Sequence, residues 1–483
     1  MQKNTHPITV IGTGITGLAI AAELLSQNQS VCLIGPRTFD GAASPAAGAM
    51  VDTFGEIADM KHPLERFQLE ARLWAQRHYG EWLEHIMERS GKQIFHVPGM
   101  FIVGNSGGDH DIEKLALMRS EMTSYQVAYE DVSPKAVPGL KSNVQYRAFD
   151  AIYMPTAMTV DTADLLSALQ QLVMQDSRCE WIEETVKTVE RTGKNWQVTS
   201  QSGKVVEAAE LIVAAGAFSH TVLGDDLWQE AGLPPLYFGR GASCIATPTE
   251  PIPHAIRTPN RALACGIHIV PRAHGKLYLG ATNLFGTDHR RATQGATVGE
   301  LHTLLGVITT QLNTTLRNVS VEHMRWGLRP VTAYDHPIAG KTALDGLSIV
   351  TGAHRTGIHM APYLSKLIVS EILGAAAITE NNHFSPATVH SLVPKEKDFA
   401  LGIRSVLATA LYPDGAMPYN RAKEVEVFIE ELFNMAITEQ GNTALRQRMK
   451  QLVDDISIDE QRMIRIFHEV LQERIPEDGP YVM

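Results

Sequence analysis

The first forty residues alternate between short apolar runs and a glycine-rich turn. Residues 8–11 (ITVI) form an apolar run typical of a buried parallel strand, and residues 31–34 (VCLI) form a second one. Between them, residues 18–25 (LAIAAELL) are rich in alanine and leucine, which favours a helix. The pattern therefore predicts a strand–helix–strand unit at the start of the chain, of roughly 30 residues.

The turn of this unit contains Gly12, Gly14 and Gly17 in the order G-x-G-x-x-G. The first glycine permits the tight turn, the second lets a pyrophosphate approach the backbone, and the third lets the helix pack closely against the strand. The N-terminus of the helix also presents N–H groups and the positive end of its dipole to phosphates. The turn therefore predicts a dinucleotide site.

The end of the second strand leaves the identity of the dinucleotide open. An acidic residue is expected there, to accept hydrogen bonds from the adenosine ribose, and Gly35 occupies its place. Arg37 follows two residues later and would suit a ribose 2′-phosphate. The turn alone leaves FAD, NAD and NADP as alternatives.

Length, charge and cysteine content limit the class of protein. A chain of 483 residues predicts two or three domains, and its net charge of −11 disfavours nucleic acid and anionic membranes as partners. The cysteines at 32, 179, 244 and 265 show no CxxC pair, so we expect reduced thiols and no metal site. With no secretory segment and no apolar run long enough to span a bilayer, we expect a cytoplasmic protein.

Five later segments complete an ordered set of motifs. In chain order they are the small-residue loop 42–50 (AASPAAGAM), 160–166 (VDTADLL), 209–219 (AELIVAAGAFS), the pair 268–272 (HIVPR) with 277–282 (LYLGAT), and the pair 326–330 (WGLRP) with 352–362 (GAHRTGIHMAP). The set resembles the D-amino-acid oxidase family of FAD-dependent oxidoreductases, and most closely its glycine oxidase and sarcosine oxidase branch. The resemblance extends over roughly residues 6–375 and implies FAD rather than NADP.

The resemblance implies an α/β (α+β) fold. A Rossmann-like FAD-binding domain is expected to stand beside an antiparallel-sheet substrate domain. The FAD-binding domain would comprise residues 1–95, 160–230 and 325–375, and the substrate domain residues 96–159 and 231–324. Asp161 or Thr162 is expected to cap one helix, and the last glycine turn to open another at 362–373.

The same resemblance assigns residues to the cofactor. They are Gly12, Gly14, Ile15, Thr16, Gly17, Gly35, Ala43, Ser44, Ala47, Gly48, Ala49, Val186, Ala215, Gly216, Gly352, His354, Arg355, Thr356, Gly357 and Ile358. No cysteine follows 326–330 at the spacing that sarcosine oxidases use to tether flavin, so non-covalent FAD is expected.

Four residues are candidates for the substrate. Arg329 lies in the family's G-L-R-P motif, and its guanidinium would grip a carboxylate through two parallel hydrogen bonds. Arg355 is a second candidate near flavin and substrate. His268 stands where related oxidases carry a tyrosine, and Asn283 where glycine oxidases carry an apolar residue. Both changes favour a pocket that is more polar than that of the relatives.

The resemblance implies oxidation of a small amine or amino acid to an imine, with O₂ reoxidising the flavin to give H₂O₂. The alternatives are a dehydrogenase subunit that passes electrons to a partner protein, and a flavin-binding scaffold without catalysis. Residues 376–397 are expected to be a polar linker, and 398–483 a helical C-terminal module with a capping box at Ser457 and Glu460. This module would cap the oxidase, form a homo-oligomer contact, or dock a partner protein.

Overall fold

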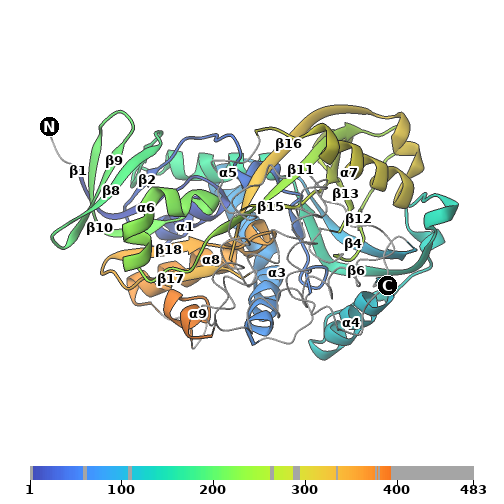
Figure 1. Ribbon diagram of the computed structural model, residues 1–483, viewed down its shortest axis with the longest axis horizontal. Coiled ribbons are helices and arrows are strands. Elements are labelled where there is room, and N and C mark those ends of the chain that lie inside the picture. The colour runs from blue at the N-terminus through green and yellow to red at the C-terminus, as the bar shows by residue number, and fades with distance from the viewer. Residues whose placement is uncertain are drawn as a thin grey trace, which may run out of the picture.

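Two β-sheets lie side by side along the long axis of the molecule, with a long helix between and below them (Figure 1). The computed structural model describes residues 4–57, 63–106, 111–260, 266–286, 294–332, 336–375, 378 and 381–392. The predicted C-terminal module at 398–483 lies outside the described residues.

The first sheet is mainly parallel and has the order β17-β18-β10-β1-β2-β7. β9 pairs antiparallel with β10, and β8 with β9, which extends the sheet beyond this path. The strands are β1 (Asn4–Ile11), β2 (Val31–Ile34), β7 (Cys179–Ile182), β8 (Val186–Thr192), β9 (Asn195–Ser200), β10 (Val205–Val213), β17 (Ile338–Lys341) and β18 (Leu347–Thr351). β2 is buried along its whole length, as expected for a central parallel strand.

Helices cover both faces of this sheet. One core joins the sheet to α1, α3, α5 and α8, and a second core on the opposite face includes α6 (Figure 1). The helices here are α1 (Ile15–Ser26), α3 (Pro63–Ser90), α5 (Thr162–Gln175), α6 (Ser219–Glu230) and α8 (Gly357–Leu373). Asp161 caps α5 by accepting from the N–H groups of Ala163 and Asp164, which confirms the expected cap.

The second sheet is mainly antiparallel, with the order β15-β11-β14-β13-β12-β4-β6-β3. β16 pairs with β11 along almost its full length, and β5 with β6. The strands are β3 (Met50–Val51), β4 (His96–Asn105), β5 (Glu130–Asp131), β6 (Ala148–Val160), β11 (Tyr237–Thr247), β12 (Ala255–Arg257), β13 (His268–Pro271), β14 (Leu277–Gly280), β15 (Leu284–Gly286) and β16 (Ser320–Val331). The remaining α-helices described are α2 (Ala43–Ala46), α4 (Asp111–Ser124), α7 (Val298–Gln311) and α9 (Pro386–Leu392).

A parallel, helix-covered sheet beside an antiparallel sheet confirms the predicted mixed α/β fold. The exact domain boundaries stay a prediction. Across the ranges that the structure covers, no helix is both long and apolar enough to cross a membrane.

Helix α8 differs from its predicted bounds. It begins at Gly357 rather than at 362, so Pro362 lies inside it. A proline has no N–H to donate to the carbonyl four residues earlier, which here belongs to Ile358. The hydroxyl of Tyr79 on α3 donates to that carbonyl at 3.0 Å instead. A side chain from a distant helix therefore satisfies the carbonyl that proline leaves without its usual donor.

Part of the predicted linker is structured. Within 376–397, residues 386–392 form α9, and Phe384 is buried. The side-chain amide of Asn382 donates to the carbonyl of Ala339 on β17 at 2.7 Å. This segment therefore packs against the edge of the first sheet.

The packing of α1 on β1 depends on one glycine. A Cβ at Gly17 would lie 1.9 Å from the carbonyl oxygen of Gly12, so the helix could not approach the turn this closely. A Cβ at Gly80, in the middle of α3, would meet nothing within 4 Å. A side chain is therefore excluded at Gly17 by close packing, whereas at Gly80 there is room for one.

We expect Gly17→Ala to lower the free energy of unfolding by about 2 kcal/mol or more, because the new methyl group overpacks the turn. Gly80→Ala should raise it by about 0.5–1 kcal/mol, because alanine favours the helix. Urea unfolding of both variants measures the difference. Equal effects in the two variants would contradict the close packing at Gly17.

Candidate active site and cofactor cavity

One long cavity of about 760 Å³ runs between the two sheets. Its wall includes the β1–α1 turn at one end of its length and the β12, β13 and β16 residues Arg257, His268 and Arg329 at the other. The volume lies within the range of small-molecule and cofactor sites, which is about 300–1,000 Å³.

Most of the predicted cofactor residues line this cavity. Of the twenty, only Gly17 and Gly352 do not. Gly17 instead supports the close packing of α1, and a Cβ at Gly352 would lie 2.8 Å from Cγ2 of Thr332. Both glycines therefore shape turns that border the cavity.

The N-termini of two helices face the cavity. α1 begins after Gly14 and α8 after Thr356; neither N-cap residue caps its helix with its own side chain, and neither first turn contains an acidic residue. Gly12 has φ +119°, and a Cβ there would lie 2.3 Å from the carbonyl oxygen of Ala214. The two helix ends and the close backbone fit a dinucleotide with a pyrophosphate at α1 and a ring near α8.

Gly35 and Arg37 have structural partners at the α1 end. A Cβ at Gly35, where φ is +155°, would lie 2.8 Å from the side chain of Thr13. Arg37 donates from Nε to Glu183 at 2.7 Å and from Nη2 to the other oxygen of the same carboxylate. Because Glu183 already engages Arg37 through both carboxylate oxygens, this arginine needs no 2′-phosphate as a partner.

The small-residue loop is held by its carbonyl groups. Arg272 donates to the carbonyls of Ala47 and Gly48 at 3.2 and 2.9 Å, and the hydroxyl of Tyr278 donates to that of Ala46 at 3.0 Å. A Cβ at Gly48 would lie 3.0 Å from Nε2 of His268. Small residues are therefore needed on this loop because side chains of the second sheet pack directly against it.

Arg329 projects from β16 into the cavity and lies flat over the neighbouring strand. A Cβ at Gly241 on β11 would lie 2.1–2.4 Å from its guanidinium atoms. Its Nη1 donates to the carbonyl of Thr282 at 3.1 Å and to Oδ1 of Asn283 at 3.0 Å. Within the described part of the chain, Nε and Nη2 have no hydrogen-bond partner. One edge of the guanidinium is therefore fixed and the other is available to a ligand.

Asn283 is buried and does not line the cavity. Its Oδ1 also lies 3.2 Å from Nε2 of His354, which belongs to the turn before α8. The backbone N–H of His354 donates to the carbonyl of Pro330, next to Arg329 on β16. Asn283 therefore acts behind the cavity wall, where it joins the predicted carboxylate anchor to the turn of α8.

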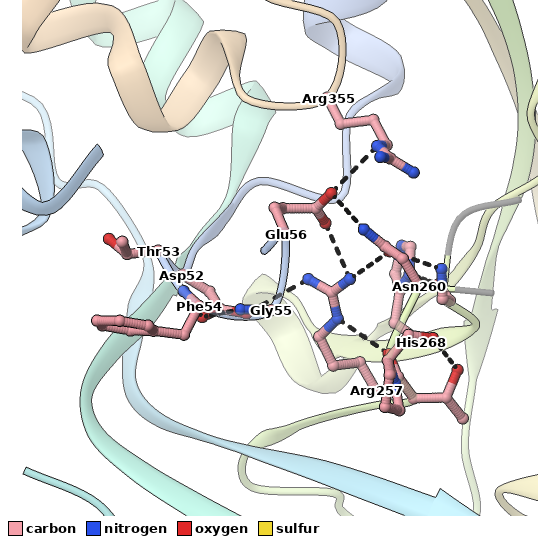
Figure 2. A network of polar contacts seen from close by, with 12 residues as sticks. Asp52, Thr53, Phe54, Gly55, Glu56, Arg257, Asn260, His268 and Arg355 are labelled. Carbon is pink, nitrogen blue, oxygen red and sulfur yellow. Dashed lines mark hydrogen bonds and ion pairs between the residues drawn. The ribbon is translucent and has the colours of Figure 1, made fainter. Parts of the chain in front are cut away.

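A network of buried charges, in which only Arg355 is a sequence-based candidate, completes this end of the cavity. Figure 2 shows the carboxylate of Glu56 between the guanidinium groups of Arg257 and Arg355. The distances are 2.8 Å to Nη2 of Arg257 and 3.1 Å to Nε of Arg355, and the side-chain amide of Asn260 donates to Glu56 at 2.8 Å. Asp52 contacts Nη1 of Arg257 at 3.3 Å. Arg355, one of the candidates, is thus held by a residue that the motifs did not indicate.

The two carboxyl groups of this network have opposite pKa shifts. Burial alone would raise the pKa of Glu56, but Arg355 and Arg257 outweigh burial, so its pKa lies well below the ordinary value. The pKa of Asp52 is raised, because burial outweighs the attraction of Arg257. Glu56 is therefore a permanent carboxylate and a poor base.

His268 is neutral in this environment. It is buried, and burial with the charge of Arg257 lowers its pKa to about 3, although a hydrogen bond to Gly266 opposes the shift. Its Nδ1 donates to the carbonyl of Gly266 at 2.7 Å, so Nε2 carries no proton. The ring stacks on Tyr278 with the planes 5° apart. His268 therefore forms a polar but uncharged part of the wall.

No group of His, Cys, Asp and Glu side chains that could hold a metal ion occurs among the residues described. None of the three cysteines described, Cys32, Cys179 and Cys244, lines the cavity. The histidines near the turn, His354 and His359, instead contact Asn283 and the carbonyl of Arg72.

We expect the low pKa of His268 to make stability depend on pH. Between pH 7 and 5 the unfolded chain takes up a proton, since a histidine in water has a pKa of about 6.5, whereas the folded ring does not. The free energy of unfolding should therefore decrease when the pH is lowered from 7 to 5, and His268 should contribute about 2 kcal/mol to this decrease. In His268→Gln this part of the fall should be missing when urea unfolding is compared at the two pH values. An equal fall in both proteins would mean that the folded ring is protonated in this range.

Comparison with known proteins agrees with this site. A family model described as FAD dependent oxidoreductase (DAO) matches residues 7–371. The chain is 28% identical over 394 residues to the bifunctional protein ThiO/ThiG of Synechocystis sp., a match that covers 80% of this chain and 54% of that protein. The chain therefore spans about half the length of that relative.

A glycine oxidase of Geobacillus kaustophilus is 23% identical, over 77% of this chain and 94% of that protein. The crystal structure of glycine oxidase from the same organism superposes with a TM-score of 0.69 and 20% identity, over 79% of this chain and 98% of the other. At this identity the structural match supports the fold. Since the family model covers well over half of the 483 residues, the chain belongs to the FAD dependent oxidoreductase (DAO) family.

Proposed function

We propose that this FAD-dependent oxidoreductase oxidises the C–N bond of a small amino acid or amine to an imine. FAD supplies the chemistry of accepting a hydride equivalent from the carbon next to nitrogen. The single observation that carries the proposal is Arg329, whose ligand-facing edge lies in the same cavity as the N-terminus of α8. Relatives named glycine oxidase, which match over nearly their whole length, support a small amino acid as substrate.

Arg329 binds the substrate carboxylate in this proposal. Its Nη1 is held by Thr282 and Asn283, so Nε and Nη2 can donate two parallel hydrogen bonds without reorienting the side chain. A guanidinium fixed beforehand loses little freedom when the substrate binds. The fixed orientation of Arg329 therefore defines where the substrate carboxylate binds in the cavity.

The remaining wall is largely apolar, and neither Glu56 nor His268 is a strong base for the amine. Apolar lining residues include Ala49, Met50, Leu328 and Ile358. Glu56 and His268 both have lowered pKa values, so neither takes a proton readily at neutral pH. The amine therefore reacts in its neutral form, after it has lost its proton to solvent.

Anaerobic mixing of the FAD-loaded protein with amino acids and amines tests the proposal directly. We expect one or more of them to bleach the flavin absorbance, and O₂ to restore it with release of one H₂O₂ per substrate. Bleaching without peroxide would mean that electrons pass to another acceptor. Absence of bleaching by any amine would contradict the proposed reaction.

Denatured protein should release its FAD, because the cofactor is proposed to be non-covalent.

Replacement of Arg329 tests the carboxylate anchor. We expect Arg329→Met to raise KM for amino acids by roughly 30- to 1,000-fold, corresponding to about 2–4 kcal/mol of lost binding. KM for an amine without a carboxylate should change little. Arg329→Lys should be intermediate, because it retains charge but loses the planar fork.

Arg325→Met is the matched control for this variant. Arg325 lies on the same strand, does not line the cavity and donates to the carbonyl of Pro45. It should leave KM near the wild-type value. Similar KM increases for amino acids and for carboxylate-free amines in Arg329→Met would argue against the anchor.

A further inference from the structure

The end of β2 lacks the acidic residue that binds the adenosine ribose in many dinucleotide sites, and the structure gives a steric reason. A Cβ at Gly35 would lie 2.8 Å from both Cγ2 and Oγ1 of Thr13, so the side chain of Thr13 fills the space beside this residue. An acidic residue would also be strained there, because φ is +155°. The ribose hydroxyl groups therefore need acceptors from other residues.

Thr13 can supply one acceptor. It lies in the turn between Gly12 and Gly14, and it lines the cavity at the α1 end. Its hydroxyl donates to the carbonyl of Pro36, and a hydroxyl has only one proton to donate. Among the residues that the structure describes, none donates a hydrogen bond to this hydroxyl oxygen. Thr13 is therefore available to a ligand as an acceptor.

Gln170 on α5 can supply a second acceptor in the same way. It lines the same cavity, and its Nε2 donates to the carbonyl of Arg37 at 3.1 Å. This bond orients the amide group, and its Oε1 accepts no hydrogen bond within the described ranges. Two side chains thus donate to consecutive carbonyl groups of the loop after β2, and each keeps an acceptor.

A carboxylate also lies near the end of β2, on the neighbouring strand. Glu183 follows Ile182, whose carbonyl accepts from the N–H of Gly35. Glu183 does not line the cavity, however, and both of its carboxylate oxygens accept from Arg37. The acceptors that border the cavity here are therefore the neutral groups of Thr13 and Gln170.

We propose that Thr13 and Gln170 bind the adenosine ribose of FAD, in place of the carboxylate that other dinucleotide sites carry after the second strand. Each accepts a hydrogen bond from one of the two ribose hydroxyl groups. A 2′-phosphate offers acceptor oxygens instead of this donor, so it would leave one of the two residues without its bond. Because the subsite concerns the cofactor, it is independent of the substrate and the reaction proposed above.

Competition between FAD and its analogues tests the subsite without turnover. The analogues lack either the 2′-hydroxyl or the 3′-hydroxyl group of the adenosine ribose. FAD-loaded protein is exchanged to equilibrium against an excess of FAD and one analogue in equal amounts, and the bound flavins are separated and quantified. We expect each missing hydroxyl to lower the relative affinity roughly 3- to 10-fold, as for one hydrogen bond between neutral groups. Equal binding of FAD and both analogues would overturn the proposal.

Variants assign each preference to a residue. In Gln170→Leu, one of the two hydroxyl groups should no longer affect binding, so that FAD and the corresponding analogue bind equally. Thr13→Val should have the same effect for the other hydroxyl. Gln171→Leu is the matched control and should keep both preferences, because Gln171 bonds to Gln175 and does not line the cavity. Both preferences surviving in either Gln170→Leu or Thr13→Val would overturn the proposed pair.

A variant of Glu183 separates the proposal from its rival. Glu183→Gln should keep both preferences, because the proposed acceptors remain in place. Loss of a preference in this variant, with both preferences intact in Gln170→Leu, would assign the ribose to the carboxylate and overturn the proposal. If Thr13→Val does not retain FAD, the comparison of Gln170→Leu with Gln171→Leu decides the outcome.

Discussion

The largely buried carboxylate of Glu56 sets the geometry of the cavity. Glu56 follows β3, Arg257 ends β12, and Arg355 belongs to the turn before α8, so three distant segments meet at one ion pair network. Loss of one partner from such a network leaves an uncompensated buried charge, which costs about 3–5 kcal/mol. The network therefore ties the antiparallel sheet to the helix end that faces the cofactor.

The arginines of this cavity share a second constraint, which is the lack of a Cβ beneath them. Gly241 lies directly under the guanidinium of Arg329, and a Cβ at Gly55 would lie 2.8 Å from Nη1 of Arg257. That same Cβ would lie 1.8 Å from Oδ2 of Asp52, whose Oδ1 accepts from the N–H groups of Phe54 and Gly55. A planar cation can thus pack face to face with backbone only where glycine removes the side chain. Glycines outside the dinucleotide turn therefore shape the arginine-lined wall of the cavity, as Gly12 and Gly17 shape the turn itself.

These contacts explain which features the sequence predicts. The β1–α1–β2 unit follows from local patterns, and Arg329 from a short motif, so both are accessible to sequence reasoning. The pairing of Asp52 with Arg257 joins residues 205 positions apart, and nothing local to either residue indicates it. The only local hint in the sequence is that Asp52 and Arg257 each lie in or next to an apolar strand. The start of α8 was misplaced for a related reason, because the rule that proline ends a helix is overridden by the hydroxyl of Tyr79.

Anion recognition and amine activation have a common electrostatic origin in the proposed reaction. The guanidinium groups that attract carboxylates also disfavour any additional positive charge. The pKa of His268 is lowered mainly by burial, and Arg257 and Arg329 lower it further. A substrate ammonium in the same cavity meets the same field and the same desolvation, and both lower its pKa. The neutral amine is the form that can lose a hydride equivalent from the adjacent carbon. A wall built from arginines therefore holds the carboxylate end of the substrate and, without a dedicated base, favours the reactive state of its amine end.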